Sequence, residues 1–301
     1  MSEGFVKICK FANKFYGGKT QKACKPFFIG GKQVGVIPGF VMNDVFNHPE
    51  VFNVVTDLLT GQISRVNLCS TLSTYDEKSE KLAEVLQQWR KKDSFLALKG
   101  WRDECYDVWD KFSEPALLKM ERSATSLFGV KQYGVHINGY VNHPDDGLCM
   151  WLGKRSANKP TWPNMYDQMA AGGLAAGLGI TECAKKEARE EASVPDDVLE
   201  KLKPAGTVSY MYEDERGIFP ECQYVFDLEV PLDFTPVNTD GEVESFQLYP
   251  IDKVKEMIIK DDFKFNCAIV CLDFMIRHGI ISPDAEPNYS FIMENIHKPL
   301  P

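Results

Sequence analysis

Residues 172–194 read GGLAAGLGITECAKKEAREEASV, a glycine-rich loop that runs directly into a short acidic helix. On a helix, Glu187, Glu190 and Glu191 stand at positions i, i+3 and i+4, so their carboxylates share one face within a single turn. Like charges placed in this way repel each other by about 0.2–0.5 kcal/mol for each exposed pair. The cluster therefore indicates a missing positive charge, and oxygen-only ligands favour a hard cation, Mg²⁺ or Mn²⁺.

The three glutamates also have a simpler explanation, a solvated helix face shared with Lys185, Lys186 and Arg189. The glycines that precede the helix favour the first interpretation, because four of them fall within eight residues. Glycine lets the backbone pass close to the helix, so that loop N–H groups face the position of a metal-bound phosphate. We assign this binding role to three of the glycines: Gly172, Gly173 and Gly177.

Loop and helix together resemble the Nudix box of the pyrophosphohydrolases, whose pattern is Gly, five residues, Glu, seven residues, then Arg-Glu-aliphatic-x-Glu-Glu-x-Gly-aliphatic. Gly172 takes the place of the first glycine, the three helix glutamates match those of the pattern, and Val194 takes the final aliphatic position. Leu178 stands where the pattern has the loop Glu, Lys186 where it has Arg, and Ser193 where it has the last Gly. Lys186 keeps a positive charge beside Glu187 but lacks the planar guanidinium.

The composition is that of a soluble globular protein. The 301 residues are enough for two domains, 44% of them are hydrophobic, and no apolar run approaches the length of about 20 residues that a membrane span needs. A net charge of −9 argues against general binding of nucleic acid, which calls for a basic surface. Nine cysteines without CxxC pairs are typical of reduced thiols, so we expect a cytoplasmic protein.

We expect a smaller α+β domain over residues 1–130. Two β-rich runs separated by Gly30-Gly31 predict a hairpin within residues 25–37. Helical spacing of apolar residues and a stop at Gly129 predict helices at residues 5–15, 43–47, 49–59, 79–91 and 117–129.

Residues 131–301 form the second expected domain. Alternating apolar and polar residues predict strands at residues 133–141, 148–155, 205–214, 221–230 and 242–248. Helices are expected at residues 251–259 and 263–278, the second of them nearly apolar all round, ended by Gly279 and therefore buried. This order fits the α/β/α sandwich that the Nudix resemblance implies, so the fold class is α/β.

Further stretches resemble one subfamily, the thiamine-pyrophosphokinase-related Nudix proteins, which carry an N-terminal domain ahead of the Nudix domain. Members of this subfamily lack the loop Glu and use Lys before the first helix Glu, as this chain does at Leu178 and Lys186. The resemblance implies a Mg²⁺-dependent phosphatase that converts damaged thiamine diphosphates, such as the oxo and oxy forms, to monophosphates. It covers nearly the whole chain, through residues 34–37, 100–106, 120–124, 133–140, 151–156, 169–173, 186–188 and 274–279.

The resemblance also implies how the site residues divide the chemistry. The three helix glutamates would bind the metal, and Lys186 would orient Glu187. One of these glutamates, or a later acid such as Glu242 or Glu244, would act as general base. Two alternatives stay open: a nucleoside-diphosphate or ADP-ribose hydrolase with the same chemistry, and a catalytically silent Nudix fold used for binding.

The expected partner is a small-molecule diphosphate, with no role for nucleic acid or membrane. The aromatic residues at 101–109 have two interpretations, packing against the second domain or stacking on a substrate ring. His136 lies on an expected strand, where a histidine is more often a hydrogen-bonded interior residue than a ligand. The candidates for contact with the substrate are Trp101, Tyr106, Trp162 and Arg155.

Overall fold

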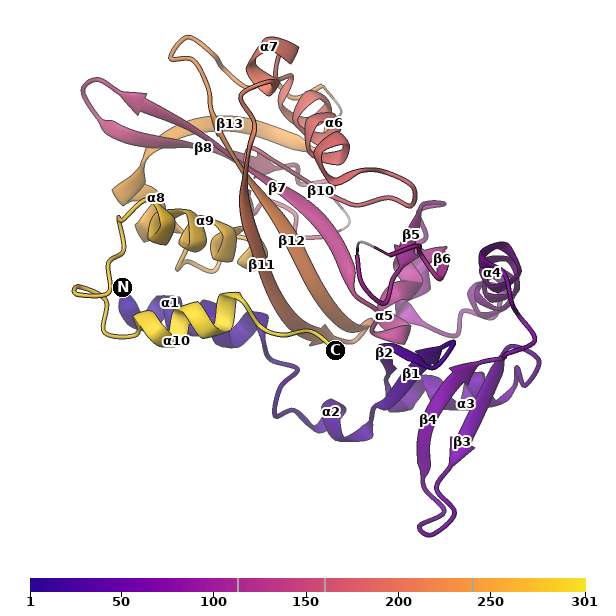
Figure 1. Ribbon diagram of the computed structural model, residues 1–301. Helices are drawn as coiled ribbons and strands as arrows, with labels where there is room; N and C mark the ends of the chain where they lie inside the picture. Colours follow the sequence, from indigo (N-terminus) through magenta and orange to yellow (C-terminus); the bar gives the residue numbers. More distant parts are fainter. Residues whose placement is uncertain (113, 160, 240) are drawn as a thin grey trace.

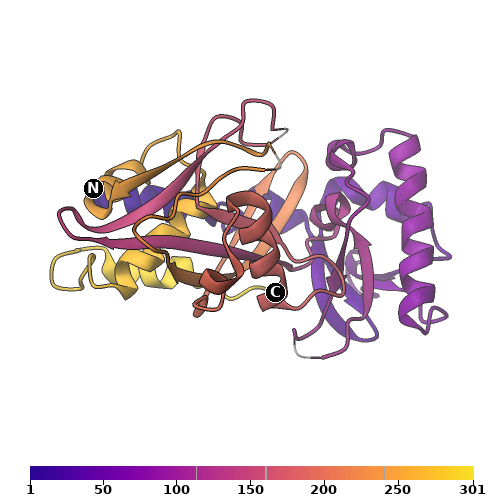
Figure 2. The ribbon, with the colours of Figure 1, turned by 90° about the horizontal axis from the view of Figure 1, so that it is seen from above.

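The computed structural model describes residues 1–112, 114–159, 161–239 and 241–301. The chain forms two bodies that lie side by side, and the one built from residues before 130 carries the long helix α4, Tyr75–Lys91, on its outer side (Figures 1 and 2). Both bodies mix helices with sheets, so the predicted α/β class with an additional N-terminal domain is confirmed. Among the helices of the described residues, none has the length and apolar character that crossing a bilayer requires.

Within the described residues, the C-terminal domain is centred on a seven-stranded sheet. Its strands are β7 Gln132–His143, β8 Gly147–Arg155, β9 Tyr166–Asp167, β10 Ala170–Gly173, β11 Lys203–Asp214, β12 Gly217–Glu229 and β13 Val243–Pro250. The main path runs β11-β12-β7-β8-β13, while β10 pairs with β7 and β9 pairs with β8. Strand β12 is parallel to β7, and the other pairs are antiparallel. The five predicted strands are confirmed, with ends that shift by at most four residues.

Helices cover both faces of this sheet, which confirms the predicted α/β/α sandwich (Figure 1). On one face, α6, Ile180–Ala192, packs small residues against Val135 and Ile137 of β7. On the other face lies α9, Phe265–Arg277, in which every residue from Cys267 to Met275 is buried, as its apolar sequence predicts. The backbone turns at Gly279 with φ of 72° just beyond this helix, as expected for its stop signal. The remaining helices of the domain are α7 Asp196–Leu199, α8 Ile251–Met257 and α10 Tyr289–Ile296.

The first helix of the chain packs with the last ones. Helix α1, Ser2–Ala12, confirms the predicted helix near residues 5–15, and its apolar residues join the same core cluster as α9 and α10. Just after α1, Asn13 donates from Nδ2 to the Asn295 carbonyl at 2.7 Å. Residues 2–12 therefore lie against the C-terminal domain, although they precede the expected boundary at residue 130.

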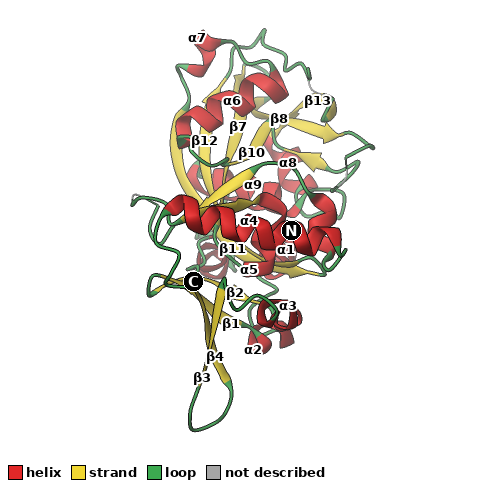
Figure 3. Cartoon of the chain, turned by 90° about the vertical axis from the view of Figure 1, so that its right-hand side faces the viewer, coloured by secondary structure: helices red, strands yellow, loops and turns green. Residues whose placement is uncertain are grey.

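In the part of the N-terminal domain that the structure describes, a four-stranded sheet runs in the order β2-β1-β4-β3. A second small sheet pairs β5 with β6. The β3–β4 hairpin extends away from the rest of the molecule (Figure 3). The elements are α2 Lys19–Ala23, β1 Lys25–Ile29, β2 Lys32–Ile37, α3 Met42–Phe46, β3 Phe52–Thr56, β4 Ile63–Leu68, β5 Cys105–Val108, β6 Leu118–Glu121 and α5 Thr125–Phe128, with 3₁₀ turns at Gly39–Val41, Leu96–Gly100 and Arg122–Ala124.

Two predicted helices of this domain are wrong. Residues 49–59 contain strand β3, because Val54, Val55 and Thr56 are β-branched and pair with β4. Residues 117–129 form strand β6, a 3₁₀ turn and the short helix α5, because β6 pairs with β5. The predicted stop at Gly129, with φ of 50°, is confirmed, and so are the hairpin at Gly30-Gly31 and the helix at residues 43–47.

Helix α4 begins four residues earlier than predicted. The Thr74 hydroxyl accepts a hydrogen bond from the Glu77 N–H, and the Glu77 carboxylate accepts one from the Thr74 N–H, which makes a capping box.

Candidate active site

The glycine-rich stretch begins as a strand rather than a loop. Gly172 and Gly173 belong to β10, where they pair with Val135 and Gly134 of β7. A Cβ atom at Gly172 would overlap the carboxylate of Glu187, and one at Gly173 would overlap the hydroxyl of Tyr106. Both glycines are therefore needed for close approach, as the sequence predicts, and the loop proper covers residues 174–179.

Two N–H groups of this loop have acceptors in the N-terminal domain. Ala176 donates to the Cys105 carbonyl at 2.8 Å, and Gly177 donates to Oδ2 of Asp107 at 2.9 Å. Gly177 has a φ of 84°, a conformation that favours glycine. The predicted role of Gly177 in phosphate binding stays a prediction, and its N–H group would have to leave Asp107 of the N-terminal domain to take that role.

The three glutamates of α6 have different surroundings. Glu187 leans on Gly172, and its side chain is 16% exposed, whereas that of Glu190 is 53% exposed. Glu191 accepts the Ala171 N–H at 2.9 Å through Oε2. Lys186 lies between two of them, with its Nζ 3.2 Å from Oε1 of Glu187 and 2.8 Å from Oε2 of Glu190.

Burial raises the pKa of the two glutamates that lie against β10, Glu187 and Glu191. Burial, together with the charges of Asp167 and Glu187, raises the pKa of Glu191 to about 8, and the hydrogen bond from the Ala171 N–H limits this rise. Burial also raises the pKa of Glu187, and Lys186 and Arg122 act in the opposite direction. The hydrogen bond to Glu190 raises the pKa of Lys186, so this side chain stays charged. The site therefore holds carboxylates whose ionised forms a nearby cation would stabilise.

The donor set of the helix suits a hard divalent cation, because Glu187, Glu190 and Glu191 offer oxygen atoms only. The raised pKa values of the two buried acids agree with such a cation. As they lie here, however, no three acid, histidine or cysteine side chains in the described ranges converge at metal-binding distance. The ammonium group of Lys186 lies between Glu187 and Glu190, so metal binding by all three requires Lys186 to turn away.

Both parts of the chain match known protein families. Residues 4–132 match a domain of unknown function, DUF4743, and residues 133–268 match the NUDIX domain. Nudix hydrolase 24, chloroplastic, of Arabidopsis thaliana is 36% identical over 271 residues, which are 88% of this chain and 70% of that protein. The chain belongs to the Nudix hydrolase family.

Two further relatives cover much of the Nudix chain. The uncharacterized protein YJR142W of Saccharomyces cerevisiae is 36% identical over 285 residues, 90% of this chain and 82% of that protein. Nudix hydrolase 20, chloroplastic, of Arabidopsis thaliana is 38% identical over 221 residues, 73% of this chain and 58% of that protein. The protein is therefore a hydrolase of phosphoric anhydride bonds from a family that uses divalent metal ions.

The other predicted acids of the Nudix domain lie near the start of β13. Glu242 forms an ion pair with Lys159, and its charge contributes to the raised pKa of Glu191. Glu244 is exposed on β13, the edge strand of the main path. Of the two later acids, only Glu242 is electrostatically coupled to the Nudix helix in this way.

Arg155 holds the loop that follows β8. Its Nη1 lies 2.8 Å from Oδ2 of Asp167, and its other nitrogens donate to the carbonyls of Thr161 and Trp162. Burial acts to raise the pKa of Asp167, but the charges of Lys264 and Arg155 outweigh it and lower the pKa. These contacts occupy all three nitrogens of the guanidinium group. The role of Arg155 in substrate binding stays a prediction.

The aromatic candidates do not gather around the glutamates. Trp101 donates from Nε1 to Asp103 at 2.7 Å and lies under the guanidinium of Arg90. Trp162 packs edge to face on Phe265, 5.6 Å between ring centres, with a backbone φ of 54°. Tyr106 is only 5% exposed and lies against Gly173, so packing between the domains, the alternative named above, describes it better than stacking on a substrate.

His136 is an interior residue, as expected. It is 3% exposed and shares a hydrogen bond with Gln168, whose Nε2 donates to Asn138 at 2.6 Å. Burial lowers the pKa of His136 to about 4, so the ring stays neutral near neutral pH.

Sequence reasoning missed residues of the N-terminal domain that border the Nudix box. Arg122 pairs with Glu104 at 3.3 Å, and its guanidinium lies 5.2 Å from the centre of the Tyr106 ring. Its charge also acts on Glu187. These residues precede the box by 50 residues or more, and the available signal was their place in stretches that the subfamily shares.

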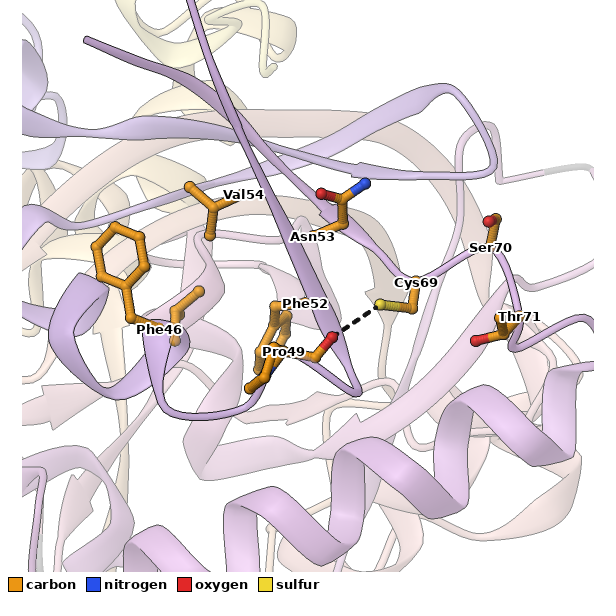
Figure 4. A pocket seen from close by; sticks show the side chains of 9 residues that line it. Phe46, Pro49, Phe52, Asn53, Val54, Cys69, Ser70 and Thr71 are labelled. Atoms are coloured by element: carbon orange, nitrogen blue, oxygen red, sulfur yellow. Dashed lines mark hydrogen bonds between the residues drawn. The ribbon is translucent and has the colours of Figure 1, made fainter. Parts of the chain in front are cut away.

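A separate cavity of about 420 Å³ lies in the N-terminal domain (Figure 4). Phe46, Pro49, Phe52 and Val54 form its apolar side, and Ser70 and Thr71 lie at its polar end. Across it, the Cys69 thiol donates to the Pro49 carbonyl at 3.4 Å. None of its lining residues belongs to the Nudix box, so we do not assign it to the hydrolase reaction.

Proposed function

We propose that this Nudix protein hydrolyses damaged thiamine diphosphates, such as oxothiamine and oxythiamine diphosphate, to the monophosphate and inorganic phosphate. Water is the second substrate, and one phosphoric anhydride bond is broken. The carrying observation for the chemistry is the buried acid pair Glu187 and Glu191 beside Gly172. The choice of organic group rests on the chain-long resemblance to the thiamine-pyrophosphokinase-related subfamily.

Glu187, Glu190 and Glu191 would hold Mg²⁺ or Mn²⁺. A divalent ion bound there supplies Lewis-acid charge to the diphosphate. When the metal binds, Lys186 would leave its ion pairs with Glu187 and Glu190. Its ammonium group would then lie beside the phosphates and attract their negative charge. One of these three glutamates, or Glu242 or Glu244, would act as the general base that takes a proton from the attacking water.

Two other functions compete with this proposal. A nucleoside-diphosphate or ADP-ribose hydrolase would use the same box, because box residues act on the diphosphate that all these substrates share. A catalytically silent binding protein is favoured by one observation, the pairing of Lys186 with two of the three glutamates. Release of phosphate that depends on a divalent metal separates this third function from the other two.

The test is turnover measured with oxythiamine diphosphate, thiamine diphosphate and ADP-ribose, each with Mg²⁺, with Mn²⁺ and with EDTA. We expect EDTA to abolish turnover, added metal to restore it, and kcat/KM to be highest for oxythiamine diphosphate. These thiamine compounds differ by one ring substituent, and an unpaired polar group costs about 1–3 kcal/mol, or roughly 10- to 100-fold in rate. A preference for ADP-ribose would transfer the assignment to that substrate class, and full activity in EDTA would remove the metal from the mechanism.

We further propose a cytoplasmic location. All nine cysteines are free thiols, which suits a reducing compartment. Cell fractionation tests this, and recovery of the protein in an organelle fraction would contradict it.

A further inference from the structure

Three consecutive residues of strand β5 lie along the glycine-rich stretch of the Nudix box. The Cys105 carbonyl accepts the Ala176 N–H at 2.8 Å, and the Asp107 carboxylate accepts the Gly177 N–H at 2.9 Å. Between them, the Tyr106 hydroxyl lies where a side chain at Gly173 would be. Figure 1 shows β5 and β6 beside the loop that leads into α6.

Strand β5 is itself held firmly. The second oxygen of Asp107 accepts the hydroxyl of Tyr75 at 2.6 Å, and Tyr75 is the first residue of α4. Burial and this hydrogen bond raise the pKa of Tyr75, so its hydroxyl remains a donor. Asp107 is 6% exposed, and its neighbour Val108 lies in the core of the N-terminal domain. The carboxylate therefore joins the loop to a rigid part of the other domain.

Besides the contacts with β5, the loop is held by Leu174, which is buried in the core of the Nudix domain, and by two backbone hydrogen bonds. Leu174 donates to the Tyr133 carbonyl at 2.8 Å, and Leu178 donates to Ala175 within the loop at 3.1 Å. At Gly177, the backbone has open space on the side of the absent Cβ. A displaced loop moves both of its ends, which are Gly172 with Gly173 and the first turn of α6. Glu187 lies on α6 and is in contact with Gly172, so a displacement of either end of the loop affects it.

We propose that strand β5 of the N-terminal domain is part of the hydrolase site, and that Asp107 is a positioning residue that fixes residues 174–179. The N-terminal domain thus completes the Nudix site by holding the loop from which the metal-binding helix starts. Asp107 acts through Gly177 and does not touch the diphosphate. The measurement of kcat rests on the proposed function, whereas hydrogen exchange of the loop amides is measured without any substrate.

The main variant is Asp107→Ala in the full chain, compared with Asp107→Asn and Tyr75→Phe. Asn keeps an oxygen that accepts the Gly177 N–H, whereas Phe removes the donor that holds Asp107. The matched control is Asp110→Ala, which removes an ion pair with Lys32 at 3.0 Å in the same domain and leaves the loop contacts in place. Hydrogen exchange of peptides that span residues 174–179, kcat, KM and thermal unfolding are measured for each.

For Asp107→Ala we expect exchange of the loop amides to be at least about tenfold faster and kcat to fall roughly 10- to 100-fold, with KM changed less. Asp107→Asn should keep most of the activity, Tyr75→Phe should lie between the two, and Asp110→Ala should match wild type. Unchanged loop exchange in Asp107→Ala overturns the proposal, and so does an equal loss in Asp110→Ala.

If Asp107→Ala does not fold, Tyr75→Phe provides the comparison because it removes the hydroxyl that holds the Asp107 carboxylate, and wild-type exchange of the loop amides in that variant counts against the proposal. If wild type hydrolyses none of the three diphosphates, the proposed function fails. The exchange measurement still decides whether β5 holds the loop.

Discussion

Within the face of helix α6 that carries the three glutamates, the side that faces solvent and the side that lies against β10 place the same residue type in different surroundings. On the outer side, Glu190 is half exposed and ion-paired with Lys186, an i,i+4 pair on the surface that contributes about 0.3–0.5 kcal/mol. On the inner side, Glu187 and Glu191 are partly buried against β10, and this burial raises the pKa of both. Ionisation is therefore unfavourable for two of the three glutamates of the Nudix box, Glu187 and Glu191, although Glu190 lies within one turn of both.

Neutralising the carboxylates tests this difference most directly. Glu191→Gln and Glu190→Gln should each lower kcat by orders of magnitude, because each removes a ligand charge from the metal without changing the size of the side chain. The control is Glu182→Gln in the first turn of the same helix, which should have little effect because this residue lies outside the cluster. Steady-state kinetics at saturating Mg²⁺ measure all three. A large loss at Glu182 with none at Glu190 would show that the box is in another register.

The inner side can also be disturbed from the strand that it contacts. Gly172→Ala places a methyl group on the Glu187 carboxylate, so we expect kcat to fall roughly 10- to 100-fold through misplacement of that group. Gly100→Ala is the matched control, because a Cβ there meets no atom within 4 Å. Kinetics and thermal unfolding of both variants are compared, and an active Gly172→Ala would mean that Glu187 is free to move.

A further expected effect concerns stability in EDTA. The pKa of Glu191 is about 8 in the folded protein and about 4.3 when unfolded, so the folded state binds this proton more tightly. Its contribution to stability is then greatest at low pH and is lost as pH rises from about 4 to about 8. Glu191→Gln cannot ionise, so its stability relative to wild type should increase over that range. Urea unfolding at about pH 5 and pH 8 measures the gap, and an equal gap at both would contradict the assigned pKa.

Sequence patterns predicted the C-terminal domain well because its elements carry their own signals. Its five main strands alternate, α9 is apolar on all sides, and Gly279 marks its end. In the N-terminal domain, residues 117–129 have helical periodicity, yet pairing with β5 makes their first part a strand. Tertiary pairing overrides a local pattern of this kind, and no local signal reports it.

The candidate site divides in the same way. The spacing of Glu187, Glu190 and Glu191 is a local pattern, so their shared helix face could be predicted. The contact of Asp107 with Gly177 joins residues 70 positions apart and could not. The glycines were correctly expected to allow close approach, but what approaches them is Glu187 and Tyr106.

Helix α1 gives the molecule an order of assembly. It precedes its partners α9 and α10 by more than 250 residues, so it is synthesised well before them. The hydrogen bond from Asn13 to Asn295 closes a separation of 282 residues, and contacts of such separation form slowly. The apolar side of α1 therefore stays without these two partners until α9 and α10 have been synthesised, which is a period of exposure to aggregation. For the same reason, a fragment that starts at residue 131 would lack Phe5, Ile8 and Cys9, and the surface of α9 that they cover would face water.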